Sequence, residues 1–446
     1  MVATDMPSRQ VLALPGGAPW AHRRVRLNEW VRERFWSIPV ALVLAGVLIA
    51  VVVSRPGLLG LPADWDLGHI VRVRTADTLL QVMASSMLTF VGVVFAITLV
   101  GLQLASAQLS PRVIRTFVRS GVTKTAFGVF LAIFAFAVTA IAFDNIDNPA
   151  AASRTVGAAV AMLGIAIAMF IVYVTATMRL LEVGWVITAV ANEARVAISR
   201  TSPPASTYIG VAPPGLVAEP HTIHLSATDT RGFKGVLGTV LGIDRYRLVR
   251  LGHTYDCVIE LLPRIGEYVP TGGPVFAIHG GARPRDSEVL ACLDLGRART
   301  LYQDPTFGIR QLVDVGTQAL SPAINQPSTT AQVIDRLQDL LIRLGRVPLP
   351  TGLYADNDAV VRLVEPTHEA SYLLNLAFQE ISQLGSSSWH VTRRLGAAYD
   401  DLAVATPEDW QPTIASLRAS LERMAREHSP DGWDGSAVVP DRLGLG

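Results

Sequence analysis

The sequence TLLQVMASSMLTFVGVVFAITLVGLQLASAQLS, residues 78–110, contains no charged residue and decides the fold of this chain. As a helix, an apolar run of about 20 residues crosses the hydrocarbon core of a bilayer. Three further apolar runs occupy residues 35–53, 126–143 and 155–178. The chain is therefore predicted to be an integral membrane protein in which residues 35–180 form a bundle of four transmembrane helices.

Composition divides the chain into an apolar first part and a second part of ordinary globular composition. Hydrophobic residues make up 50% of the sequence and charged residues only 17%, and the shortage of charge lies almost entirely before residue 181. The expected fold class is a membrane α-helical bundle followed by a cytoplasmic α+β region, with a small β-domain and then a helical domain. The expected segments are a cytoplasmic N-terminal segment (1–34), the transmembrane domain (35–180), a helical extension with a proline-rich linker (181–220), a β-rich domain (221–297), a helical domain (298–428) and a disordered tail (429–446).

The charges in the loops orient the bundle. Arginines precede the first run, and the loop between the second and third runs contains Arg112, Arg115, Arg119 and Lys124 without an acidic residue. The other two loops are poorer in cations and contain several aspartates. Because cytoplasmic loops carry the excess of Lys and Arg, we expect a multi-pass protein of the bacterial inner (plasma) membrane, with its N- and C-termini in the cytoplasm.

Small and polar residues recur along the second run at steps of three and four, with one double step, which places them on one face of a helix. Two explanations compete for this face. Small and hydroxyl side chains let neighbouring helices pack closely, whereas hydroxyls and amides can also line a water-filled path for a permeant. The candidate pore-lining residues are Gln81, Ser85, Thr89, Gly92, Ala96, Gln103 and Ser106.

A basic amphipathic helix is expected after the second run. Ser110 and Pro111 are suited to its N-cap and its first position, and Arg112, Arg115 and Arg119 share one side. These arginines can bind anionic lipid headgroups or, if the bundle is a pore, surround its cytoplasmic mouth. The four apolar runs contain no charged residue, which argues against a proton-coupled transporter.

Beyond residue 220 the sequence changes from a strand pattern to a helix pattern. Short apolar segments bounded by glycines predict strands at 222–225, 236–241, 257–262 and 275–279. Helical spacing then predicts helices around 309–320, 333–344, 367–384, 387–403 and 412–427. These patterns predict the small β-domain and the helical domain.

The sequence contains none of the common catalytic or nucleotide-binding motifs. The spacing of His221 and His224 directs their rings to opposite faces of a strand, which disfavours a metal pair. Cys257 and Cys292 are expected to be buried thiols, because a structural disulfide is unusual in the cytoplasm. A net charge of +1 gives no indication of nucleic-acid binding. We therefore expect no enzymatic activity, no cofactor and no nucleic-acid partner.

Polar residues gather in two short segments of the predicted helical domain. Asp304 is suited to cap one helix, and Ser328 or the preceding Asn325 to order the start of the next, so one explanation is two capped helices joined by a tight turn. The alternative is that both segments converge with the end of the second transmembrane helix to form a gate, an ion site or a ligand site. The residues of this candidate site are Arg299, Gln303, Asp304, Asn325 and Gln326.

Three segments carry a resemblance to a known family: QLASAQLSPR at residues 103–112, QDPTFG at 303–308 and ALSPAIN at 319–325. Over most of its length, the chain resembles an uncharacterised bacterial family of predicted integral membrane proteins, classed as a domain of unknown function. The resemblance implies four transmembrane helices and a soluble C-terminal region, and it supplies no established activity. The family pattern carries Asp after the Asn, where this sequence has Gln326, which argues against a carboxylate-dependent metal or catalytic role at this turn.

Two functions are compatible with these patterns. The leading hypothesis is a homo-oligomeric ion channel or channel-like permeation protein, in which the second transmembrane helix lines the path and the cytoplasmic region gates it. Four helices per chain are few for a path within one subunit, so we expect a symmetric assembly. The alternative is a membrane-anchored sensor or scaffold whose cytoplasmic domain binds a ligand or a protein.

Overall fold

The computed structural model describes residues 9–13, 36–54, 76–108, 121–143, 149–201, 208–211, 219–226, 238–428 and 439–442. The chain divides into two compact units. The membrane bundle comprises Arg24–Trp185, and the soluble unit comprises Met1–Arg23 together with Val186–Gly446. Each unit has its own hydrophobic core.

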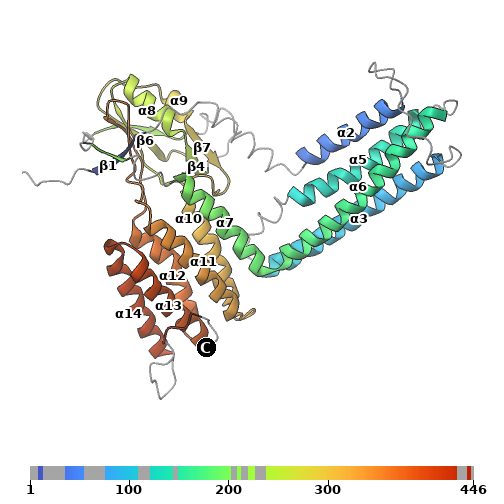
Figure 1. Cartoon of the computed structure of the whole chain (residues 1–446). Coiled ribbons are helices and arrows are strands. Elements are labelled where there is room, and N and C mark those ends of the chain that lie inside the picture. Colours follow the sequence, from blue (N-terminus) through green and yellow to red (C-terminus); the bar gives the residue numbers. More distant parts are fainter. Residues whose placement is uncertain are drawn as a thin grey trace, which may run out of the picture. The chain divides into compact units, whose positions relative to one another are not determined.

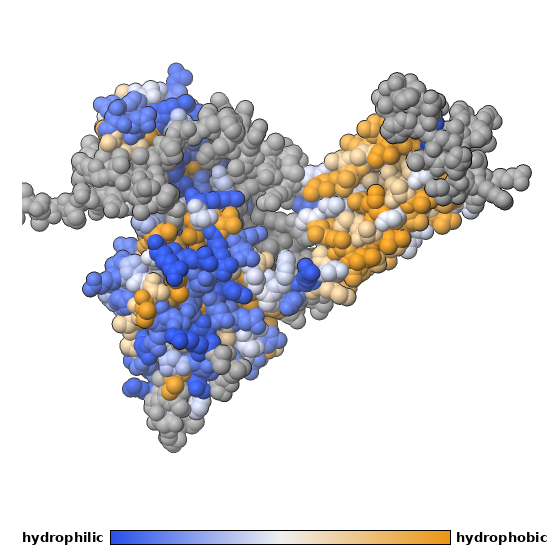
Figure 2. Space-filling model, in the orientation of Figure 1, coloured by the Kyte–Doolittle hydropathy of each residue, from blue (hydrophilic) through white to orange (hydrophobic). Residues whose placement is uncertain are grey.

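Four long helices form the membrane bundle (Figure 1). All four are long and apolar enough to cross a membrane. Their inner faces share a core that includes Leu80, Phe130 and Phe136, and their outer faces are also hydrophobic, as Figure 2 shows. A helix that is apolar all round is typical of a membrane span, so the predicted four-helix membrane fold is confirmed. The helices are α2 (Ser37–Ser54), α3 (Ala76–Gln108), α5 (Gly121–Phe143) and α6 (Pro149–Leu181).

Helices α2 and α5 approach each other closely at two glycines. A Cβ atom on Gly46 of α2 would collide with the backbone carbonyl of Ala132 in α5. A Cβ atom on Gly128 of α5 would lie 2.6 Å from Cδ1 of Leu42 in α2. Small residues at such positions let helix backbones pack without intervening side chains.

The spans extend further than the apolar runs alone indicate, which corrects the expectation that they contain no charged residue. Helix α5 begins at Gly121 and therefore includes Lys124, which is buried. The span formed by α3 begins at Asp77, and that of α6 runs from Arg154 to Arg179. The charged residues lie near the helix ends, where long side chains reach the interface.

A mixed sheet of seven strands forms the centre of the soluble unit, in the order β2-β1-β8-β9-β5-β6-β3. The pairs β1–β8 and β5–β9 are parallel, and the other neighbouring pairs are antiparallel. The strands are β1 (Arg9–Ala13), β2 (Tyr208–Val211), β3 (His221–His224), β5 (Val258–Leu261), β6 (Pro274–His279), β8 (Leu353–Ala355) and β9 (Val361–Val364).

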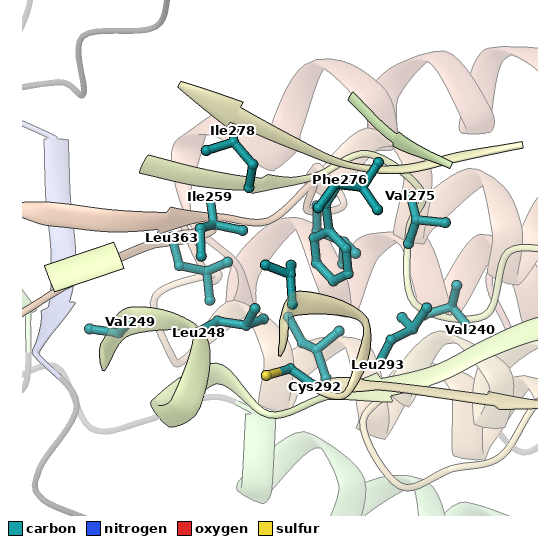
Figure 3. Close-up of a cluster of buried hydrophobic side chains, with 14 of the residues drawn as sticks. Val240, Leu248, Val249, Ile259, Val275, Phe276, Ile278, Cys292, Leu293 and Leu363 are labelled. Carbon is teal, nitrogen blue, oxygen red and sulfur yellow. The ribbon is translucent and has the colours of Figure 1, made fainter. Parts of the chain in front are cut away.

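A second layer packs against this sheet. It contains the antiparallel pair β4 (Thr239–Ile243) and β7 (Leu293–Gly296) and the helices α8 (Arg245–Thr254) and α9 (Asp286–Leu290). Figure 3 shows side chains of β5, β6 and β9 pointing toward those of α8, β4 and β7. The predicted thiols Cys257 and Cys292 are both free and buried, and burial raises the pKa of Cys292 to about 12.

Amphipathic helices complete the soluble unit. Each buries one apolar stripe, such as Leu337, Leu341 and Leu344 of α11, as the helical spacing predicts. Helix α7 follows α6 after the single residue Glu182 and directs Ala191 and Ala194 inward. The helices are α7 (Val183–Thr201), α10 (Pro305–Ala319), α11 (Pro327–Gly345), α12 (Ala370–Gly385), α13 (Trp389–Ala405) and α14 (Gln411–Glu427), with the short 3-10 helix η4 (Glu408–Trp410) before α14.

The sheet draws on more of the chain than residues 221–297. Strands β8 and β9 come from the segment expected to be wholly helical, and β1 and β2 precede the expected domain. Within the proline-rich linker, residues 202–207 and 212–218 lie outside the described residues, as does the tail apart from residues 439–442.

Candidate functional site

The buried face of α3 consists of large apolar side chains. Leu80, Met83, Met87 and Val94 are buried against the other helices of the membrane bundle. Tyr173 of α6 adds a polar contact on this side, because its hydroxyl donates to the carbonyl of Val94 (2.9 Å) and lies 2.7 Å from the hydroxyl of Thr98.

The predicted polar stripe lies on the opposite face of α3. Ser85 and Gln103 each lie about two and a half helical turns from Val94, which places them on the far side of the helix. Every described stripe side chain is exposed on the surface of the single chain, whereas the side chain of Ser106 lies outside the described residues. A Cβ atom on Gly92 would meet no atom within 4 Å. The stripe therefore does not pack within its own bundle.

The hydroxyls of the stripe bond to their own helix. Ser85 donates to the carbonyl of Val82 (3.0 Å), and Thr89 donates to the carbonyl of Ser85 (3.1 Å). Such bonds reduce the cost of a hydroxyl in an apolar medium and leave its oxygen able to accept another hydrogen bond. The stripe is thus compatible with a neighbouring copy of the helix or with water.

The predicted basic residues Arg112, Arg115 and Arg119 lie outside the described residues. Their role at lipid headgroups or at a cytoplasmic mouth remains a prediction.

The first half of the predicted gate or ligand turn forms a compact polar cluster at the start of α10. The buried carboxylate of Asp304 accepts from Nε of Arg299 (2.8 Å), from the hydroxyl of Thr306 (2.6 Å) and from the backbone N–H of Phe307 (3.1 Å). Asp304 is therefore the N-cap of α10, as predicted. Arg299 also donates to the hydroxyl of Thr306 and lies over the ring of Phe307.

Gln303 connects this cluster to β4. Its amide accepts from the backbone N–H of Ile243 and donates to the carbonyl of the same residue, both at 3.1 Å. Gly266, which has a φ of +91°, leaves room for the cluster, because a Cβ atom there would collide with Asp304 and Arg299. The cluster therefore links α10 to the β-layers of the soluble unit.

The second half of the predicted site lies at the other end of α10. Asn325 adopts a left-handed conformation with a φ of +44°, and its N–H donates to the carbonyl of Ser321 (2.9 Å). Gln326 precedes α11, and its N–H donates to the carbonyl of Ala319 (2.7 Å). Because α10 separates the two halves by about 22 Å at 1.5 Å per residue, the structure does not bring all five residues together in one chain.

A partly enclosed pocket of about 90 Å³ adjoins the Asp304 cluster. Its walls are mostly apolar and include Ile309, Leu349 and Leu373. Thr201, the last residue of α7, also lines it. No local pattern in the sequence indicates this pocket, because its walls come from segments that are far apart along the chain.

Two paired charges lie in the wall of the pocket. Arg245 donates to both carboxylate oxygens of Glu365 at 2.7 Å and lies over the ring of Tyr354. Burial opposes the charge of Arg245, but the facing carboxylate of Glu365 outweighs burial and raises the pKa of the guanidinium. The guanidinium of Arg245 is therefore charged, and two hydrogen bonds fix its position against Glu365.

His368 lines the same pocket and stacks on Tyr372 with 4.3 Å between ring centroids. Burial lowers the pKa of His368, and the charges of Arg264 and Arg299 lower it further. The ring is therefore neutral at pH 7, with one nitrogen able to donate and the other able to accept a hydrogen bond.

A cluster of His253, Asp356 and Asp358 has the spacing of metal ligands. However, Asp356 already accepts from Nε of Arg362 (2.8 Å), lies 3.0 Å from Nδ1 of His253 and accepts from the backbone N–H of Val360 (3.0 Å). Burial alone would raise the pKa of Asp356, but these hydrogen bonds outweigh it and lower the pKa to about 2. The guanidinium of Arg362 thus provides the positive charge that a metal would otherwise supply, and we assign no metal to this cluster.

Comparison with known proteins agrees with the membrane fold. The family profile described as "Predicted membrane protein (DUF2254)" matches residues 32–401, and the chain belongs to this family. Uncharacterised proteins of Mycobacterium bovis and Mycobacterium tuberculosis are 24% identical over 424 residues, which cover 86% of this chain and 76% of each relative. No solved structure matches the chain. The family resemblance identified from the sequence is confirmed.

Proposed function

We propose that this member of the family is a homo-oligomeric channel or channel-like permeation protein of the bacterial inner membrane, gated by its cytoplasmic region. The observation that supports the proposal is the polar stripe of α3, which lies on the surface of the bundle opposite the buried face. The proposal assigns no catalytic reaction to the chain.

The contrast between the two sides of α3 supports an assembly of several copies. Large apolar side chains such as Leu88 and Phe95 are exposed on the flanks of the stripe and suit lipid. The two glutamines of the stripe lie near the ends of the span, about 33 Å apart along the helix, where their amides can reach the interface. Between them, the hydroxyls of Ser85 and Thr89 lie within the hydrocarbon thickness, and a ring of α3 helices around an axis would give them water or one another as partners.

The position of β1 supports a common side of the membrane for both ends of the chain. This strand precedes the first span, yet it pairs with β2 and β8, which follow the fourth span. A strand cannot join a sheet across a bilayer, so an even number of spans connects the two segments. Together with the basic second loop, this pairing favours a cytoplasmic location for both termini.

Ion flux into liposomes containing the purified full-length protein tests the proposal. Gly92→Phe places a bulky side chain on the exposed stripe, at a position where an added Cβ atom meets no atom within 4 Å. We expect flux to fall at least about tenfold, the effect of about 1.4 kcal/mol on the barrier. Val93→Phe, on the neighbouring exposed flank, is the matched control and retains flux.

The oligomer is tested separately by cross-linking. Both native cysteines are buried, so a single Cys introduced as Thr89→Cys gives disulfide-linked dimers if copies meet along the stripe. Phe95→Cys, on an exposed flank about 120° around the helix from Thr89, is the comparison position. The absence of conductance under all ions, voltages and membrane tensions tried would refute the channel, and equal cross-linking at both positions would refute the proposed interface.

The pocket at the end of α7 favours a second candidate function, that of a membrane-anchored sensor or scaffold. In that case the bundle serves only as an anchor, and the soluble unit, located in the cytoplasm, binds a ligand or a protein. A plugged axis along the entire bundle in the assembled oligomer, together with ligand binding to the pocket, would favour this second function over the channel.

A further inference from the structure

The pocket of the soluble unit combines apolar wall residues with a few polar groups. Ile309, Leu349 and Leu373 supply aliphatic surface, and Glu365 and His368 supply hydrogen-bonding atoms. Small-molecule sites in proteins typically combine a mostly apolar wall with a few fixed polar groups. At about 90 Å³ the enclosed part is small, so it fits the body of a small molecule whose remainder extends through the opening.

The charges around the pocket are compensated. Glu365 accepts from two nitrogens of Arg245, each at 2.7 Å, and Asp304 accepts from Arg299 at 2.8 Å. His368 adds no charge at neutral pH because burial and two nearby arginines keep its ring neutral. A charged ligand would therefore bring an uncompensated charge into a partly buried site, which costs free energy.

We propose that this pocket binds an uncharged small amphiphile, with an aliphatic body against Leu349 and Leu373 and a hydroxyl or amide head near Glu365 and His368. A hydroxyl can donate to a remaining lone pair of the carboxylate and accept from the neutral imidazole. The apolar body contributes about 25 cal/mol for each Å² removed from water. The hydrogen bonds of the head and the burial of the aliphatic body together define the expected class of ligand.

Occupancy of the pocket acts on the end of α7. Thr201 lines the pocket, and α7 is fixed to the helical layer of the soluble unit at two points. Gly308 of α10 lies in direct contact with Ala194, and Arg195 pairs with Asp339 of α11 at 2.7 Å. Helix α7 also continues from the fourth span after one residue. A regulatory effect on permeation rests on the proposed channel function, whereas the binding step does not.

Hydrogen exchange of the full-length protein in detergent, read by mass spectrometry, tests the binding step. The probes are hexan-1-ol, hexylammonium and hexanoate, which share one tail and differ only in the charge of the head. We expect hexan-1-ol to slow exchange about threefold at twice its dissociation constant. The slowing should occur in residues 349–354, in residues 365–373 and in the last turn of α7, and the two charged probes should have no effect there.

Two leucine substitutions distinguish binding in the pocket from non-specific partitioning of the probe into detergent. Leu349→Trp fills the pocket, whereas Leu384→Trp adds the same side chain on the exposed surface of α12, where Leu384 is 55% exposed. Protection should disappear in Leu349→Trp and persist in Leu384→Trp. Unchanged exchange in α13 verifies that each variant folds, and Thr367→Trp at another lining position replaces Leu349→Trp if that variant does not.

The other outcomes overturn specific parts of the proposal. Equal protection by hexylammonium or hexanoate overturns the uncharged ligand class. Protection that survives Leu349→Trp, or no protection by any probe, overturns the site. Protection that stops short of α7 overturns the coupling to that helix. A lack of ion flux in liposomes would contradict the channel but would leave each of these results unaffected.

Discussion

The membrane bundle and the soluble unit achieve specific packing by different means. In the described part of the bundle, close packing rests on glycines such as Gly46 and on an apolar core, and the hydroxyls of Thr98 and Tyr173 form a polar contact between α3 and α6. The helices of the soluble unit are joined by ion pairs such as Arg394–Asp335 (2.6 Å). Each unit therefore relies on the interactions that are favourable in its own surroundings, close apolar packing in lipid and ion pairs beside an apolar core in water.

The solvent explains this division. Lipid offers no hydrophobic driving force between helices, so shape and small residues determine which helix faces meet. Water drives apolar side chains of the soluble unit into a core, and ion pairs with a buried partner such as Arg394 then fix which elements are neighbours, at a cost in desolvation. On this basis the polar stripe of α3 is the exception in the bundle, because its side chains suit neither the core nor lipid.

The largest effect should come from a cavity in the core of the soluble unit. Phe378 of α12 is fully buried and packs edge-on against Tyr399, with 5.4 Å between ring centroids. Phe378→Ala removes both the burial and the ring contact and should cost about 3–5 kcal/mol. Hydrogen exchange in α12 and α13 measures this loss regionally. Leu384→Ala, at an exposed position of the same helix, should change the stability by less than about 0.5 kcal/mol.

An intermediate effect should come from adding one methyl group to the bundle. Gly46→Ala forces the new Cβ of α2 into the carbonyl of Ala132 in α5 and should cost about 1–3 kcal/mol. Gly164→Ala in α6 meets no atom within 4 Å and should be neutral or stabilising by up to about 1 kcal/mol, since Ala favours helix. Unfolding of the bundle by SDS measures both. Equal destabilisation by both variants would contradict the glycine contact.

Local patterns were sufficient to predict most helices but not the whole sheet. The four spans and helices α10 to α14 follow from hydrophobic runs and from apolar residues at helical spacing. Strands β1, β8 and β9 are only three to five residues long. They exist because partners distant in sequence complete their hydrogen bonds, as when Leu12 pairs with Tyr354. Such pairing leaves no local periodicity.

The candidate sites show the same limit. The spacing of Ser85, Thr89 and Gly92 identified the stripe. The sequence did not show which side of α3 packs against the bundle, because the flanks of the stripe and the buried face are both apolar. The cap formed by Asp304 was predictable from the proline that follows it. The distance between Asp304 and Asn325 could not be predicted without knowing that α10 runs between them. The pairing of Arg245 with Glu365 could not be predicted either, because the folded sheet brings these two residues together.

The smallest expected effect is the loss of stability of the soluble unit in acid. The pKa of Asp356 is lowered to about 2 from 3.8 by hydrogen bonds from Arg362, His253 and Val360, which outweigh its burial. Its contribution to stability is therefore complete above pH 3.8 and is lost as the pH falls toward 2. After allowance for solvent screening, the loss is about 1–2 kcal/mol.

This acid effect should be confined to the soluble unit. The two acidic residues among the described residues of the bundle, Asp77 at the start of α3 and Glu182 after α6, are both exposed, so acid protonates no buried carboxylate among them. Exchange of β8 and β9, corrected for the intrinsic rate, should accelerate between pH 4 and pH 2 in the native chain and change less in Asp356→Asn, while exchange in α5 stays constant. Equal acceleration in α5 would show that acid destabilises the bundle as well, and the proposed division between ion pairs and apolar packing would fail.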